Sequence, residues 1–86
     1  MDETLQRFLK QHAGDGTVWF LLPGGMVSGK LNSLDSEMPE TVTLREAFVY
    51  WGHKVADVDV TTIRMSQVSA WGETLRTFLD EDFYEG

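Results

Sequence analysis

Residues 17–34 read TVWFLLPGGMVSGKLNSL, and this stretch decides the fold of the chain. It begins with the alternation of a β-strand, so that three apolar side chains share one face while Trp19 and Leu21 share the other. Because both faces are apolar, we expect a strand buried on both sides. The Pro-Gly-Gly that follows supplies the fixed φ and the positive φ of a tight turn. The pattern predicts a hairpin whose second strand covers residues 26–34.

Gly29 lies inside the second predicted strand, where a glycine weakens the strand unless the chain bends sharply or another backbone approaches closely. Such a bend is what a sheet needs in order to curl into a barrel. Alternation resumes over residues 42–51, and its parity changes near Ala47, which indicates a β-bulge. Two more segments complete five predicted strands within residues 17–71, namely residues 58–65 and 68–71.

Amphipathic helices are predicted on both sides of the strands, at residues 2–13 and 73–83. In the first helix, Asp2 is a suitable N-cap and three apolar side chains fall on one face. The second helix has the same spacing, and its opening ETLRTFL echoes the ETLQRFL of the first. We therefore expect one domain over residues 1–86, mainly β, with five strands in a strongly bent antiparallel barrel between an N-terminal and a C-terminal α-helix.

The composition restricts the kind of protein this is. The chain has 86 residues, and a domain of this size buries a limited core, so association with a partner would stabilise it. It has no cysteine, which excludes a disulfide framework and favours a reducing, cytoplasmic location. The longest apolar run, residues 18–22, is too short to span a membrane. The net charge of -7 and the scattered bases disfavour general nucleic-acid binding.

Candidate chemistry is sparse along the chain. The two histidines, His12 and His53, have no partner at the spacing that a metal site or a nucleophile requires. We therefore predict no catalytic residue, no metal and no cofactor. The best binding patch surrounds one turn, where Tyr50, Trp51, His53 and Lys54 could stack a base or clamp an anionic peptide. The alternative is that these aromatic rings pack against a helix or a neighbouring subunit.

A family resemblance supports the barrel. Residues 18–35 run apolar strand, glycine turn, apolar pair, glycine, leucine and finally Asp35, in an order that resembles the first motif of the Sm-like proteins of the LSm and Hfq type. Residues 63–68 look like a degraded second motif. The resemblance implies a five-stranded SH3-like barrel behind an N-terminal helix. A weaker likeness over residues 5–34 is to gas-vesicle accessory proteins.

The resemblance also implies partners. Sm-like proteins pair their last two strands into rings, so the implied subunit edges here are Val58, Val60, Thr62, Ile63, Val68 and Ala70. The family binds single-stranded RNA near its two motifs, which implicates Asp35, Met38 and Arg64. Pro39 stands where the family has an asparagine, and Met65 replaces the glycine of the second motif. We expect a self-associating, ring-forming interaction module, with RNA binding or a gas-vesicle accessory role as alternatives and a second protein as another candidate partner.

Overall fold

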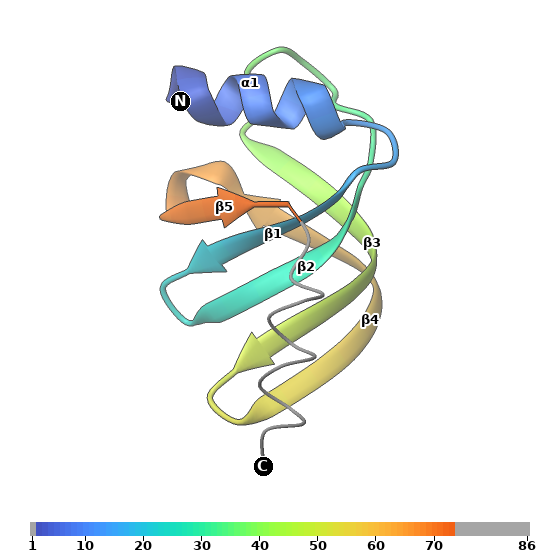
Figure 1. Cartoon of the computed structure of the whole chain (residues 1–86), viewed down its shortest axis with the longest axis vertical. Helices are drawn as coiled ribbons and strands as arrows, with labels where there is room; N and C mark the ends of the chain where they lie inside the picture. Colours follow the sequence, from blue (N-terminus) through green and yellow to red (C-terminus); the bar gives the residue numbers. More distant parts are fainter. Residues whose placement is uncertain (1, 74–86) are drawn as a thin grey trace.

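The computed structural model of the chain describes residues 2–73, and Figure 1 shows a short helix lying across one end of a strongly curved sheet. The elements are α1 (Glu3–His12), β1 (Thr17–Leu22), β2 (Gly25–Leu31), β3 (Thr41–Trp51), β4 (Lys54–Arg64), a 3₁₀ turn (Met65–Gln67) and β5 (Ala70–Gly72). The mainly β architecture with an N-terminal helix is confirmed. The predicted helix at residues 73–83 lies beyond the described residues, apart from Glu73.

The first helix begins and ends as its sequence dictates. Asp2 is the N-cap, and its Oδ1 accepts a hydrogen bond of 2.7 Å from the backbone N–H of Thr4. The helix stops at Ala13 because Gly14 follows with a φ of 104°, which an L side chain rarely adopts. Within residues 2–73, no helix reaches the length and apolar character that a membrane crossing requires.

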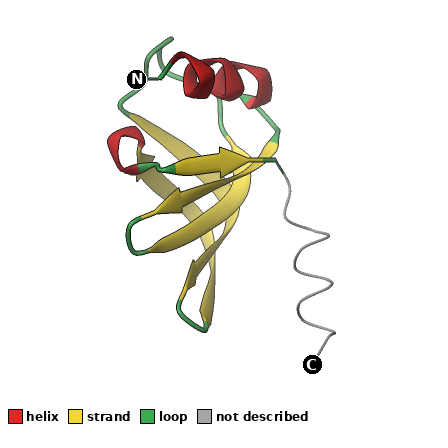
Figure 2. Cartoon of the chain, turned by 60° about the vertical axis from the view of Figure 1, so that its left-hand side comes forward, coloured by secondary structure: helices red, strands yellow, loops and turns green. Residues whose placement is uncertain are grey.

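The five strands form one antiparallel sheet in the order β4-β3-β2-β1-β5. The predicted hairpin is present: β1 and β2 pair from Thr17 opposite Lys30 to Leu22 opposite Gly25, around a turn at Pro23 and Gly24. Figure 2 shows the strands wrapping around one another, with α1 covering one end of the curved sheet. This order leaves β4 and β5 as the two edges of the sheet.

A β-bulge divides β3, as the parity of its sequence predicts. Between the Ser28 and Lys30 pairings, the single residue Gly29 of β2 lies opposite two residues of β3, Glu46 and Ala47. Glu46 takes a φ of 50°, in the left-handed region. A Cβ on Gly29 would lie 2.9 Å from the Cβ of Ala47, closer than real Cβ atoms approach. The close approach expected at this glycine is therefore present.

The core lies inside the curve of the sheet and under α1. Leu5 and Leu9 of the helix are buried against the inner side chains of the strands, so the helix closes the end of the barrel. The buried apolar side chains are Leu5, Leu9, Val18, Phe20, Val27, Leu31, Val42, Leu44, Ala47, Ile63 and Met65. No polar or charged residue within the described part of the chain is buried among them.

The boundaries of the later strands differ from those predicted. β2 ends at Leu31, three residues before the predicted limit, and β4 begins at Lys54 instead of Val58. The early start of β4 follows from a tight turn at Gly52, whose φ of 63° lets the chain reverse at once. β5 is reduced to Ala70–Gly72 because the chain first makes the 3₁₀ turn.

The prediction that β1 is buried on both faces is wrong. Val18 and Phe20 are fully buried, but Leu21 is 42% exposed and Trp19 is partly exposed. Apolar side chains on both faces of a strand predict that other residues pack against each face. Among the described residues, only the inner face of β1 is packed in this way.

Candidate binding surfaces

A cavity of about 920 Å³ opens between the start of α1, the loop that joins β2 to β3, and the 3₁₀ turn before β5. Its lining mixes buried apolar side chains with a rim of polar ones. The lining residues are Asp2, Leu5, Met38, Pro39, Glu40, Thr41, Arg64, Met65, Ser66, Val68, Ser69 and Trp71. The volume is that of a site for one small molecule.

Contacts with α1 hold the β2–β3 loop beside this cavity. The Nζ atom of Lys10 lies 2.6 Å from Oε1 of Glu37, and the side-chain amide of Gln6 donates to the Glu37 carbonyl oxygen over 2.9 Å. The hydrogen bond from Lys10 lowers the pKa of the Glu37 carboxyl, which stays ionised. Met38 follows directly, and its side chain is 59% exposed.

Backbone pairing fixes the opposite wall of the cavity. Thr41 of β3 pairs with Arg64 of β4, and the N–H of Met65 donates to the carbonyl oxygen of Glu40 over 2.8 Å. The Met65 side chain is 6% exposed and belongs to the core. Arg64 is exposed at the rim, so it presents a cation beside an apolar floor.

The structure brings together two of the residues that the family motifs implicate. Met38 and Arg64 line the same cavity although 26 positions separate them in the sequence. Asp35 is exposed on the β2–β3 loop and is not among the lining residues. Pro39, at the position of the family's asparagine, is buried in the cavity wall.

The aromatic turn lies elsewhere. Figure 1 places the β3–β4 turn at the end of the molecule away from α1, so the patch of Tyr50, Trp51, His53 and Lys54 is separate from the cavity. Trp51 is 42% exposed, His53 and Lys54 are exposed, and Tyr50 is half-buried. The two groups of predicted binding residues therefore form two surfaces.

The implied subunit edges lie on the two edge strands or beside them. On β4, Val60 is 60% exposed and Thr62 is exposed, whereas Ile63 is buried in the core at 3%. Val58 and Val68 also pack against the core, and Ala70 is half-buried on β5. Of these side chains, those of Val60 and Thr62 are the ones that a neighbour could contact most directly.

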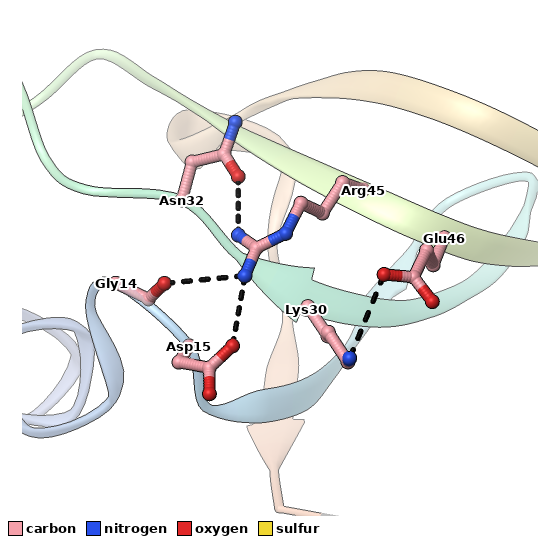
Figure 3. Close-up of polar contacts among 6 residues, drawn as sticks. All are labelled: Gly14, Asp15, Lys30, Asn32, Arg45 and Glu46. Atoms are coloured by element: carbon pink, nitrogen blue, oxygen red, sulfur yellow. Dashed lines mark hydrogen bonds and ion pairs between the residues drawn. The ribbon is translucent and has the colours of Figure 1, made fainter.

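A polar network covers the outer face of the sheet next to the end of α1. Figure 3 shows the Arg45 guanidinium at its centre, donating to Asn32 Oδ1 over 2.7 Å, to Asp15 Oδ1 over 2.8 Å and to the Gly14 carbonyl oxygen over 3.3 Å. Nearby, Lys30 Nζ lies 3.5 Å from Glu46 Oε2. These contacts join the turn after α1 to the middle of β3.

Some cavity residues have no local signal in the sequence. Asp2 and Leu5 read as a helix cap and a core position, and Trp71 reads as the end of a strand. They meet at the cavity because α1 folds back over the 3₁₀ turn, a long-range arrangement that a sequence pattern does not specify. No group of three or more His, Asp or Glu side chains able to hold a metal ion occurs among residues 2–73.

Comparisons with known proteins agree with the geometry. No family model matches the chain, and no curated protein matches its sequence. Among solved structures, the Pyrococcus abyssii Sm protein in complex with a uridine heptamer superposes with a TM-score of 0.63, at 23% identity over 79% of this chain and 94% of that chain. The P. aerophilum SmAP1 heptamer gives a TM-score of 0.65, at 20% identity over 86% of this chain and 97% of that chain.

The chain has the Sm-like fold. These similarities cover nearly the whole of both solved structures and about four fifths or more of this chain. The Sm-like fold is also found in a chain of the NatC complex bound to CoA, with a TM-score of 0.60, 14% identity, and coverage of 84% of this chain and 91% of that one. The fold therefore occurs in a heptamer, in a protein bound to a uridine heptamer and in a complex of another kind.

Proposed function

We propose that this chain is a non-enzymatic interaction module that self-associates into a ring through β4 and β5. The observation that carries the proposal is that the sheet ends on these two strands, with no described strand covering the outer side of either. Exposed strand edges present unpaired backbone N–H and C=O groups that pair readily with another chain. An edge of each kind on every copy permits head-to-tail contacts, which form a ring when the rotation between successive copies closes.

The side chains of β4 support the same assignment. Val60 and Val55 are 60% and 51% exposed on this strand, an apolar character that open edge strands normally avoid. The heptameric P. aerophilum relative has the same fold. A small core also favours assembly, because each copy gains buried apolar surface from its neighbours.

Native mass and light scattering on the full chain at tens of micromolar test this proposal. We expect a mass of several copies for the wild type and a shift toward the monomer for Val60→Lys, which places a charge on the β4 edge. Met38→Lys is the control, because Met38 is as exposed at 59% but belongs to the β2–β3 loop and to neither edge strand. A wild-type chain that is monomeric at this concentration would contradict the proposal.

A second candidate function is binding of single-stranded RNA at the cavity. It is favoured by the convergence of Met38 and Arg64 on one apolar-floored site that has room for a base, and by the uridine heptamer bound to the P. abyssii protein. Two acids, Asp2 and Glu40, share the cavity with Arg64, and the chain carries a net charge of -7. Both features weaken phosphate binding, so we place RNA second.

Fluorescence anisotropy with a labelled oligouridine at low salt distinguishes the two roles. Under RNA binding, Arg64→Ala weakens the complex, while Lys30→Ala on the outer face leaves it nearly unchanged. Phosphate contacts are strongest at low salt. If neither oligouridine nor oligoadenine changes its anisotropy under that condition, RNA binding is eliminated and the ring-assembly proposal is unaffected.

A further inference from the structure

An unbroken apolar ladder crosses the outer face of the sheet. The pairings of all five strands place Ala70, Leu21, Met26, Tyr50 and Val55 side by side, one from each strand. Leu21 is 42% exposed and Val55 is 51% exposed. Facing side chains on adjacent strands project to the same face, so the ladder is one continuous surface.

The neighbouring ladder extends this surface. It contains Gly72, Trp19, Ser28, Phe48 and Asp57, with Phe48 at 42% exposure. Together the two ladders define an outer apolar face. An exposed contiguous apolar surface of this kind on a small protein marks an interaction site.

The chain leaves the described structure at the border of this face. Trp19 lies over Gly72, where an added Cβ would be 2.6 Å from the indole Nε1. Glu73 is held by His12, whose Nε2 lies 3.0 Å from Glu73 Oε1. Glu73, the last described residue, therefore lies beside β5, at one end of both ladders.

The sequence after Glu73 has the amphipathic pattern of a helix that could pack on this apolar face. Leu75, Phe78, Leu79 and Phe83 recur at helical spacing, while the residues between them are mainly polar or charged. The same ETL…FL pattern in α1 places its leucines, Leu5 and Leu9, in the core with the phenylalanine packed beside them. The pattern in this fold thus serves to bury a helix against the sheet.

We propose that residues 74–83 dock as an amphipathic helix across the outer apolar face of the same chain. Ten helical residues extend about 15 Å, and three inter-strand spacings of about 4.8 Å cover nearly the same distance, so the helix reaches from β5 to β3. The apolar side of this helix would cover Leu21, Met26 and Phe48.

Charge fixes the direction of this helix. A run from β5 toward β4 brings the acids Asp80, Glu81 and Asp82 toward the β3–β4 turn, where His53 and Lys54 are exposed. Within residues 2–73 these two side chains form no ion pair, so the approaching carboxylates supply the missing partners. The docked segment lies on the outer face and leaves both sheet edges open for assembly.

Thiol reactivity in the full chain tests the docking, because the protein has no cysteine of its own. Leu79→Cys introduces one thiol on the apolar side of the segment, and Thr77→Cys is the matched control on its opposite side. We expect alkylation of the Leu79→Cys thiol to be roughly tenfold slower or more, since it requires the segment to open first. The thiol of Thr77→Cys should react at the rate of an exposed cysteine.

A second substitution identifies the surface that gives the protection. Leu21→Asp in the Leu79→Cys chain should restore fast alkylation, whereas Met38→Asp, at a similarly exposed apolar residue away from the face, should not. Equal rates at both thiols, or protection that Leu21→Asp leaves intact, would overturn the proposal. Protection that disappears on dilution would overturn it too, because it would place the segment on a second copy.

Discussion

The outer face of the sheet consists of a polar half, whose side chains are hydrogen-bonded, and an apolar half, whose side chains are partly exposed. Near α1 the face is polar, and Arg45 binds two loops through three hydrogen bonds. Beyond the bulge the face is apolar, and Leu21 and Val55 remain about half exposed. The polar half is complete within the described residues, whereas the apolar half lacks a cover. Substitutions in and between the halves separate the contributions of core, bulge and surface.

The largest loss of stability should come from Phe20, which faces the core between the outer-face residues Trp19 and Leu21 of β1. Phe20 is fully buried, so Phe20→Ala should destabilise the fold by about 3–5 kcal/mol, enough to unfold a marginally stable domain. Chemical denaturation of Leu21→Ala should show a loss smaller by at least about 2 kcal/mol, because its side chain is 42% exposed. Similar losses for both variants would mean that the two faces of β1 are equally packed.

Two glycines of β2 lie close against β3, Gly29 at the bulge between the halves and Gly25 within the apolar half. A Cβ on Gly25 would collide with the carbonyl oxygen of Tyr50, and one on Gly29 would press on Ala47. We expect Gly25→Ala and Gly29→Ala each to cost about 1–3 kcal/mol in the free energy of unfolding. Gly24→Ala, in the open turn, should change it by about 0.5 kcal/mol or less, measured in the same denaturation series.

A smaller effect is expected within the polar half. Arg45→Ala removes the donor of three hydrogen bonds and should destabilise the fold by about 1 kcal/mol. Lys30→Ala breaks an exposed ion pair of 3.5 Å and should cost about 0.5 kcal/mol or less. If the two losses measured by thermal unfolding are equal, the Arg45 network does not hold the turn after α1.

The smallest effect is a dependence of stability on pH at the border of the two halves. The Phe8 carbonyl oxygen, hydrogen-bonded to the His12 ring, raises the pKa of His12 above its ordinary value of 6.5, against an opposing effect of burial, and Glu73 raises it further. Because the folded protein holds this proton more tightly, the stabilisation is complete below pH 6.5 and is lost as the pH rises through the higher folded pKa. The free energy of unfolding should fall over that range in the wild type relative to His12→Gln, measured in parallel.

Much of the fold could be predicted from local chemistry. The turn at Pro23 and Gly24, the close approach at Gly29 and the change of parity near Ala47 each depend on neighbours in the sequence, and each is confirmed. The start of β4 was missed, because residues 55–57 read as part of a loop until their pairing with β3 is known. Pairing between distant strands, more than propensity, decides such boundaries.

The candidate site was only partly predictable. The family motifs identify Met38 and Arg64, and the structure places both at one cavity. They do not separate these residues from the aromatic turn, because the curvature of the sheet, which carries Tyr50 to Lys54 away from α1, is a property of the whole barrel. Nor does alternation along β1 reveal that Leu21 lacks a cover, since burial depends on what lies above the sheet.

The unequal lengths of the two edge strands affect what an assembly of this chain could bind, and how many partners it could hold. β4 has eleven residues and β5 has three, so a neighbour's β5 can occupy only a small part of β4. The rest of the long strand would stay available for main-chain pairing with an extended peptide from an unrelated protein. An assembly built from this chain would then display one such acceptor groove per copy, arranged around its circumference, and could gather several identical clients at once.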